Sequence, residues 1–420
     1  MADDDAACRA PRGTRDVLPP ESVEWQQVVR LALDLFAEAG YSPIETPAFE
    51  HTEVFERGVG ATSEVVGKQM YTFRDRGDRS LTLRPEGTAP VVRAVLEHNL
   101  HRGPLPVKLS YASWMFRQER PQKGRYRQFF QVGIEAIGSD NPLVDAEVIE
   151  IGRRFYSAAG VDTTLLLNSI GHPDPSCRQG YTGVLAEYLE RHRSALAEDD
   201  RERITTNPLR TFDSKETSTQ EVMREAPLIS DHLCDACRKH FETVCGLLDD
   251  LGVPYTLEPR LVRGLDYYTR TALEFVAGNL GSQNAVGGGG RYDGLSESLG
   301  GPPLPGIGIA PGIDRILLAR AAGDAPASSV RAYVVAVGER AAPEALAIAT
   351  ALRRAGVGAD LDLMGRSMKG QMKDAVRSGA RWAVILGDDE LAARAATVKD
   401  LSTEEQRRVP FDDLATELGR

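Results

Sequence analysis

The sequence has few cysteines and no long apolar run. Only 5 of its 420 residues are cysteine, too few for a disulfide framework in a chain of this length. No segment approaches the roughly 18–20 consecutive apolar residues that a membrane-spanning helix needs. The N-terminal residues, MADDDAACRAPRG, are acidic and lack the apolar stretch of a secretory signal. We therefore expect a cytoplasmic protein without membrane association.

Several catalytic and phosphate-binding signatures are also missing. Around Gly67-Lys68 the GxxxxGK[ST] pattern of a phosphate-binding loop fails, because Thr62 replaces its first glycine and Gln69 its last residue. There is no GxGxxG between a strand and a helix, no HExxH, and no nucleophile–base spacing. Hydrolase chemistry therefore has no support, and a bound nucleotide would need another device to hold its phosphates.

The net charge of -11 argues against a protein that coats nucleic acid nonspecifically. It leaves open RNA binding at a local basic patch.

The chain is too long for one compact core, so two or three domains are expected. Residues 22–39 have helical spacing, residues 71–138 alternate as antiparallel strands around a helix at 87–98, and residues 171–258 are polar and helix-rich. After the flexible segment 323–330, strands alternate with helices, which predicts a small α/β domain. The predicted domains are 1–329 and 330–420.

Four of the cysteines lie in the helix-rich segment. Cys234 and Cys237 form a CxxC with His232, His240 and Cys245 nearby, a possible zinc-ligand set. However, DHLCDACRKHFETVC reads as one helix, and no second CxxC follows at finger spacing. We therefore interpret these residues as structural and expect no bound metal.

The densest functional signal is FRQERPQKGRYRQFFQVGIEAIG, residues 116–138. Five cations and one anion fall between residues 117 and 127, around a turn at PQKG, which predicts a hairpin with arginines on both arms. Aromatic residues alternate with the cations, a combination that suits a base stacked between a ring and guanidinium planes. Arginine also matches phosphate as a two-donor fork.

This segment resembles motif 2 of class II aminoacyl-tRNA synthetases, and the chain as a whole resembles the histidyl-tRNA synthetases. The agreement runs in order through RGTRDVLP (12–19), LRPEGTAP (83–90), NPLRTFDSK (207–215), LVRGLDYYTR (261–270), GSQNAVGGGGRYDGL (281–295) and GIGIAPGIDRIL (306–317). The resemblance implies an α+β catalytic domain on a mostly antiparallel sheet, with a helical insertion at 171–258 and a C-terminal α/β anticodon-binding domain.

The resemblance also implies roles in ATP binding. Arg117 and Arg263 would hold the α-phosphate and are the catalytic candidates, with Arg263 in a place that other class II enzymes give to a metal ion. Arg315 and Phe129 would enclose the adenine, and Arg125 and Glu119 would complete the site. Mg²⁺ is expected on the β- and γ-phosphates.

The histidine substrate is expected beside the ATP. Its amino group would contact Glu86, Thr88 and Gln131; its imidazole would meet Glu135 and Tyr268, with Tyr267 and Tyr292 lining the pocket. From the residues alone, Glu86 could also cap a helix near Gly87, and the tyrosine pair fits a half-buried strand.

The expected partners are tRNA(His) and a second copy of the chain. Arg366, Lys369, Lys373 and Arg377 form a stripe along a predicted helix, which the resemblance assigns to tRNA, as it does Arg120, Gln122 and Arg127 in the motif 2 loop. GYSPIETPAFEH, with Pro47, resembles motif 1 and implies a homodimer.

Two rival functions fit the sequence less well. Noncatalytic relatives serve as regulatory subunits in histidine biosynthesis, but they typically lack the anticodon domain and have lost nucleotide-binding arginines. A class II enzyme for proline or threonine is opposed by Glu135, Tyr268 and RGLDYY. We therefore expect a histidine–tRNA ligase.

Overall fold

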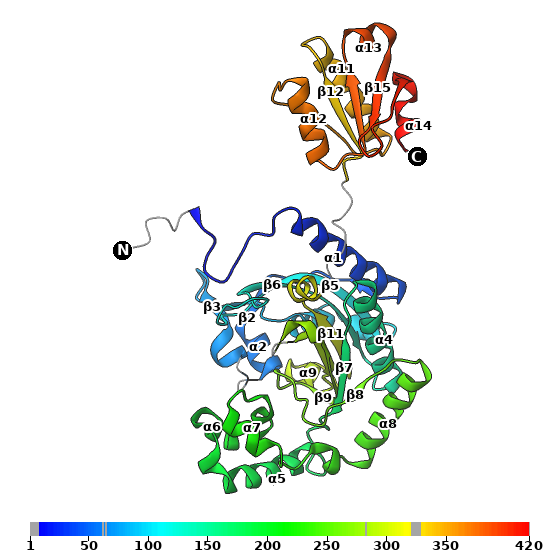
Figure 1. The fold of residues 1–420 in the computed structure, drawn as a ribbon. Coiled ribbons are helices and arrows are strands. Elements are labelled where there is room, and N and C mark those ends of the chain that lie inside the picture. The colour runs from blue at the N-terminus through cyan, green and yellow to red at the C-terminus, as the bar shows by residue number, and fades with distance from the viewer. Residues whose placement is uncertain (1–7, 61–62, 64, 282–283, 321–328, 420) are drawn as a thin grey trace, which may run out of the picture. The chain divides into compact units, whose positions relative to one another are not determined.

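The computed structural model describes residues 8–60, 63, 65–281, 284–320 and 329–419. The chain divides into two compact units, Met1–Gly323 and Asp324–Arg420 (Figure 1). The predicted linker, residues 323–330, lies mostly outside the described residues. Among the described residues, no helix is both long enough and apolar enough to cross a membrane.

The first unit is built on a sheet that has 8 strands in its described part. Its central strands are antiparallel, and only the short edge strands β1 and β8 pair in parallel. In spatial order the strands are β1 (Ser42–Pro43), β5 (Val107–Phe116), β6 (Gln128–Ile137), β11 (Gly306–Pro311), β10 (Ala285–Arg291), β9 (Thr269–Val276), β7 (Thr164–Ser169) and β8 (Thr256–Leu257). The prediction of a mostly antiparallel α+β domain is confirmed.

Two apolar cores cover the two faces of this sheet. One face packs against α1 (Glu21–Glu38), α4 (Pro142–Ala158) and α10 (Ile313–Ala319). The repeat of Val28, Ala32 and Phe36 explains α1, because residues four apart share the buried face of a helix. The other face packs against α2 (Thr52–Val59), α3 (Thr88–Glu97) and α9 (Leu295–Ser298). A small sheet beside them contains β2 (Phe49–His51), β4 (Ser80–Leu83) and β3 (Tyr71–Arg74).

The insertion between β7 and β8 is helical, as predicted. Its α-helices are α5 (Arg178–Arg191), α6 (Glu198–Thr206), α7 (Thr217–Met223) and α8 (Asp235–Asp250), shown in green in Figure 1. Shorter helical turns in the unit are η2 (Val65–Gln69), η3 (Leu100–Arg102), η4 (Arg193–Ala195), η5 (Pro208–Asp213), η6 (Ile229–His232) and η7 (Gly278–Leu280).

Two local predictions were wrong. The cysteine-rich run is not one helix: η6 ends at His232, and α8 begins at Asp235 with Cys234 as its extended N-cap. The tyrosine pair at 267–268 does not lie in a strand either, because β9 begins at Thr269 and the preceding segment is a buried turn. In both places a local pattern suggested a regular element where the chain changes direction.

The second unit contains a sheet with 5 strands in its described part. In spatial order they are β13 (Ala359–Leu361), β12 (Ala332–Ala336), β14 (Trp382–Leu386), β15 (Ala395–Asp400) and β16 (Gln406–Pro410). The first three are parallel, as the alternation of strands and helices predicted. The helices are α11 (Ala341–Arg354), α12 (Met368–Arg377), α13 (Asp388–Ala393), η8 (Phe411–Asp413) and α14 (Leu414–Gly419). One core contains α11 and α14, and another contains α12.

Candidate active site

Three arginines from distant parts of the sequence line one cavity of about 470 Å³. Arg117 follows the end of β5, Arg263 lies in the segment before β9, and Arg315 lies in α10. Gln131, Arg125 and a stretch of glycines in β10 line the same space. A cavity lined by this many guanidinium groups is suited to a polyanion.

Arg117 and Phe129 form one wall of the cavity. The Arg117 guanidinium lies 5.3 Å from the centre of the Phe129 ring, and its Nε donates to the carbonyl of Pro85 at 2.8 Å. Glu119 lies 3.7 Å from Arg117 and 3.5 Å from Arg125. The carboxylate therefore holds two cations at the mouth of the motif 2 loop, as expected for a preorganised anion site.

Arg315, on α10, lines the same cavity and lies beside Gly124 of the motif 2 loop. Its Nε donates to the carbonyl of Ala285. Burial, followed by the nearby charge of Arg125, lowers the pKa of Arg315. Two neighbouring cations that repel each other both gain from an anion bound beside them.

Arg263 lies where this cavity meets a group of buried tyrosines. Its Nη1 is 2.6 Å from a carboxylate oxygen of Glu274 on β9, and its guanidinium lies 5.8 Å from the Tyr268 ring centre. Burial opposes the charged form, but Glu274 leaves the pKa of Arg263 raised. A Cβ added at Gly288 would lie 2.5 Å from Arg263 Nη2, so a larger residue at this position of β10 would have to displace the guanidinium group.

Strand β6 carries several predicted residues on one face. Phe129, Gln131 and Glu135 are separated by even numbers of residues, so their side chains point to the same side of the sheet. Gly133 lies between them, where an added Cβ would come within 2.3 Å of the Tyr111 ring. The strand therefore connects the cavity, at Phe129 and Gln131, with the interior around Glu135.

Glu135 is 1% exposed and accepts two hydrogen bonds. Tyr292 Oη donates to one carboxylate oxygen at 2.6 Å, and Thr88 Oγ1 donates to the other at 2.7 Å. Burial raises the pKa of Glu135 to about 8. Tyr267 packs 4.7 Å from Tyr268 and 5.9 Å from Tyr292 between ring centres, so the predicted aromatic residues do gather around this carboxyl group.

Glu86 caps α3. Its carboxylate accepts from the backbone nitrogens of Thr88 at 2.7 Å and Ala89 at 2.9 Å, and from the hydroxyl of Tyr267 at 3.2 Å. Burial raises the pKa of Glu86. The capping interpretation is thus confirmed, and a contact with the amino group of a substrate stays a prediction.

The motif 2 loop differs in part from its prediction. Its cations lie in the loop between β5 and β6 rather than on the strands. Arg120 and Gln122 are exposed, but Arg127 is half-buried and donates to the carbonyls of Glu119 and Arg12, both at 3.3 Å. The ring of Phe130 packs against two tryptophans in the core.

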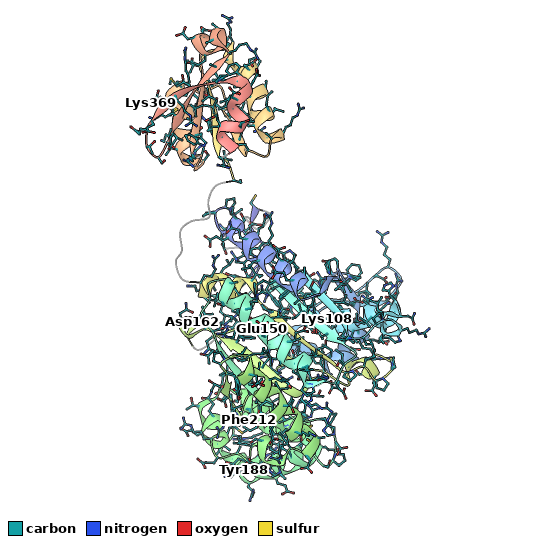
Figure 2. All side chains as sticks on the ribbon, turned by 90° about the vertical axis from the view of Figure 1, so that its right-hand side faces the viewer. Lys108, Glu150, Asp162, Tyr188, Phe212 and Lys369 are labelled. Carbon is teal, nitrogen blue, oxygen red and sulfur yellow. The ribbon has the colours of Figure 1, made fainter. Side chains whose placement is uncertain are left out.

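The basic stripe of the second unit lies on α12 and the residues before it. Asp374 pairs with both Arg366 and Arg377, and Asp362 also pairs with Arg366. Lys369, labelled in Figure 2, and Lys373 are exposed and form no ion pair within the described residues. The two lysines therefore provide most of the uncompensated charge of the stripe.

Sequence reasoning missed four residues. Asp213, Lys215 and Glu274 line the cavity, and Tyr111 lies over Gly87 and Gly133 beside the buried carboxyl groups. Burial raises the pKa of Asp213 to about 6. Asp213 and Lys215 lie within the motif NPLRTFDSK. Glu274 could have been found because it is an acidic residue within the apolar strand TALEFV.

Comparison with known proteins identifies the family of the chain. The family described as Histidyl-tRNA synthetase matches residues 13–316, and the Anticodon binding domain matches residues 331–420. The histidine–tRNA ligase of Halothermothrix orenii is 48% identical over 98% of this chain and 99% of that protein. The ligase of Corynebacterium jeikeium is 52% identical over 97% of this chain and 92% of that protein.

Solved structures agree as well. The apo histidyl-tRNA synthetase of S. aureus has a TM-score of 0.81 and 38% identity, covering 98% of this chain and 100% of that chain. An ATP phosphoribosyltransferase regulatory subunit/histidyl-tRNA synthetase from Bacillus halodurans C has a TM-score of 0.65 at 22% identity, over 90% of this chain and 97% of that chain, and shares the fold alone. With both family matches and these full-length relatives, the chain belongs to the histidyl-tRNA synthetase family.

Proposed function

We propose that this chain activates histidine with ATP and transfers it to tRNA(His), using the cavity described above. The observation that carries the proposal is the convergence of Arg117, Arg263 and Arg315 on one cavity, with the buried carboxyl group of Glu135 on the same sheet. The retained arginines and the second unit favour a ligase over a noncatalytic regulatory subunit.

In the first step, the carboxylate of histidine attacks the α-phosphorus of ATP in line. A bond forms between that oxygen and phosphorus, the bond to the leaving oxygen breaks, and pyrophosphate departs. No protein nucleophile is needed, because positioning and charge stabilisation supply the catalysis. Arg117 and Arg263 hold the α-phosphate, while Arg315 and Phe129 enclose the adenine, with Arg125 and Glu119 at its edge.

Selection of histidine rests on the buried polar groups. Glu135 and Tyr268 meet the two ring nitrogens, Tyr267 and Tyr292 enclose the ring, and Glu86, Thr88 and Gln131 take the amino group. Arg263 lies over the Tyr268 ring and lines the phosphate cavity, which supports this placement. A side chain without matching donors and acceptors would leave these groups unpaired, which gives discrimination of about 10⁴-fold or more.

Mg²⁺ is proposed to accompany the β- and γ-phosphates. The carboxylates that line the cavity already lie beside guanidinium groups, Glu119 with Arg117 and Glu274 with Arg263. Phosphate oxygens and water would therefore supply most ligands, which is the usual binding mode of this ion. Bound there, the ion would neutralise charge on the leaving pyrophosphate.

In the second step, a terminal ribose hydroxyl of the tRNA attacks the carbonyl of the adenylate. Arg120 and Gln122, exposed in the motif 2 loop, and the helical insertion at 171–258 are proposed to meet the acceptor end. The domain from 330 to 420 would bind the anticodon through α12. A cytoplasmic location and a homodimer complete the proposal.

The experiment that tests the function is ATP–pyrophosphate exchange measured separately with each of the twenty amino acids. Exchange that depends on histidine, followed by charging of tRNA(His), is expected. Absence of exchange with any amino acid would favour the regulatory-subunit function, and exchange with a different amino acid would assign another specificity.

A further inference from the structure

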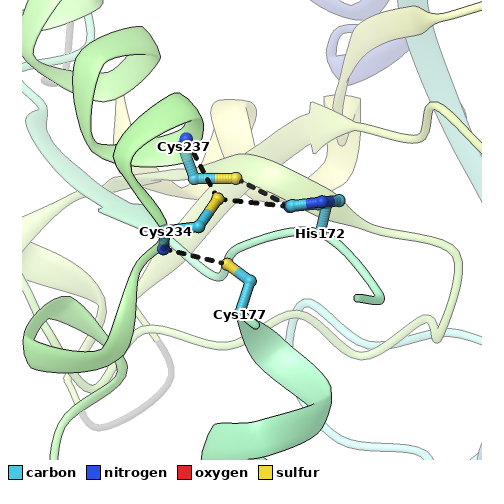
Figure 3. A group of neighbouring side chains, drawn as sticks. All are labelled: His172, Cys177, Cys234 and Cys237. Atoms are coloured by element: carbon cyan, nitrogen blue, oxygen red, sulfur yellow. Dashed lines mark hydrogen bonds between the residues drawn. The ribbon is translucent and has the colours of Figure 1, made fainter. Parts of the chain in front are cut away.

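Four potential metal ligands come together at the base of the helical insertion. They are His172, Cys177, Cys234 and Cys237, and one ligand atom of each lies within 4.8 Å of all the others (Figure 3). The first two follow β7, where the insertion begins, and the other two lie at the start of α8. The set thus joins segments about 60 residues apart.

We propose that these four side chains bind a structural zinc ion. Three thiolates and one imidazole are a common ligand set for zinc in sites that keep no open position.

The distances fit this geometry. Tetrahedral coordination with ordinary zinc–sulfur and zinc–nitrogen bonds separates neighbouring ligand atoms by roughly 3.5–3.8 Å. His172 Nδ1 lies 3.1 Å from Cys237 Sγ and 3.8 Å from Cys234 Sγ. Shifts of about 1 Å or less would bring the ligand atoms to equal spacing around an ion.

Backbone N–H groups donate to two of the three sulfurs. The Cys237 nitrogen donates to Cys234 Sγ at 3.5 Å, and the Cys234 nitrogen donates to Cys177 Sγ at 3.5 Å. Cys177 and Cys234 are also the N-caps of α5 and α8. N–H donors and helix N-termini stabilise the thiolate form that a metal needs.

Disulfide bonding does not account for the cluster. All five cysteines are free, and three sulfurs around one centre cannot all pair as disulfides. The two histidines near the CxxC in the sequence have partners elsewhere: His240 bonds to Asp145, and the His232 ring packs against Tyr181. The local CxxC therefore contributes half of a site whose other half lies upstream.

The proposed ion would tie together the two ends of the insertion. It would also support the tyrosine pocket, because Arg178, next to Cys177, donates to the carbonyl of Tyr268 at 2.5 Å. This connection to the pocket rests on the proposed function, whereas metal binding itself does not.

The test is the metal content of the full-length protein, purified without an affinity tag and measured by plasma mass spectrometry. About one zinc per chain is expected for the wild type. The double variant Cys234→Ser/Cys237→Ser should lose it almost completely, and Cys245→Ser, a matched change on α8 outside the cluster, should retain it. Wild-type protein that lacks zinc and takes up none when zinc is added would overturn the proposal, as would a double variant that retains the metal.

A second measurement covers variants that fail to fold. Wild-type protein stripped with a chelator is titrated with Co²⁺, whose thiolate charge-transfer absorption reports sulfur ligation. One equivalent should produce this band, and zinc should displace it. A cobalt spectrum without thiolate bands would contradict the site, even if the protein still catalyses pyrophosphate exchange.

Discussion

Arg263 has two neighbours of opposite kind, a carboxylate on β9 and the face of a tyrosine ring. Glu274 fixes the guanidinium at the cavity before any substrate arrives. The Glu274 carboxylate thereby offsets the free energy needed to bury the Arg263 charge. The Arg263 side chain then needs little rearrangement when negative charge develops nearby.

Replacing Arg263 with alanine should therefore remove stabilisation of the transition state. Arg263→Ala is expected to reduce histidine-dependent pyrophosphate exchange roughly 10²–10³-fold, because a preorganised donor to developing charge is lost. Thermal melting should show a folded protein. Arg260→Ala, an exposed arginine in the same segment, is the control and should exchange normally. Near-normal exchange in Arg263→Ala would remove this role.

Glu135 makes stability depend on pH. Its pKa is about 8 in the folded protein, above the value of about 4.3 for an unfolded glutamate. Between these values the folded state holds a proton that the unfolded state has released, so this group stabilises the fold fully below about pH 4 and loses that effect as pH rises through 8.

Glu135→Gln removes this titration. From about pH 5 to about pH 8, the free energy of unfolding of wild type should fall relative to the variant by roughly 1 kcal/mol per pH unit. Urea unfolding at several pH values measures the difference. The exposed Glu187→Gln should show no such trend, and parallel pH curves for Glu135→Gln and wild type would contradict the buried, protonated carboxyl group.

At the scale of elements, helices and strands with regular apolar spacing were predictable, but the turns between them were not. The helix at α1, the strand-to-helix unit of β11 and α10, and the parallel strands of the second unit all follow from apolar spacing. The antiparallel strands β15 and β16 went unpredicted. The segment before β9 looked like a strand because its buried tyrosines are selected by tertiary contacts.

The residues of the candidate site also fall into predictable and unpredictable groups. Residues within motifs, such as Arg117 and Arg315, were placed by resemblance and do line one cavity. Glu274 and the ligand pair His172 and Cys177 depend on contacts between distant segments, which no local spacing reveals. Arg127 donates to two backbone carbonyls within the protein, and its contact with tRNA stays a prediction.

Helix α12 should act in tRNA binding alone. Lys369→Ala with Lys373→Ala is expected to raise the KM for tRNA roughly tenfold and to reduce its salt dependence by about one unit of slope per lysine. Pyrophosphate exchange should stay unchanged. The control is Arg340→Ala with Arg354→Ala, exposed cations on the N-cap and last turn of α11. An equal loss of exchange and charging would argue against the assignment.

At the scale of the whole molecule, an exposed aromatic pair on the small sheet is a candidate contact for the proposed homodimer. Phe49 and Phe73 are 49% and 43% exposed, and their ring centres are 6.2 Å apart. Pro47 and Phe49 also line a broad cavity of about 1220 Å³. Apolar side chains grouped on a surface are typical of an interface between proteins.

Phe49→Asp with Phe73→Asp should therefore convert a dimer into a monomer, because two buried charges would face each other across the symmetric contact. Light scattering coupled to size-exclusion chromatography measures the mass. Leu143→Asp, a 58% exposed position on α4, should leave the dimer intact. A dimeric mass for the double variant would place the interface elsewhere.

Strand β6 carries Phe129, which is proposed to stack on the base, near one end and Glu135, which is proposed to bind the imidazole, toward the other. Glu135 lies six residue steps along the extended strand from Phe129, a span of about 20 Å that pleated backbone cannot stretch or shorten. The proposed site would therefore also select a ligand by its length. An analogue with a longer or shorter link between its base and its imidazole could place one of these two groups correctly. It could not place both and also hold its phosphorus in line for attack.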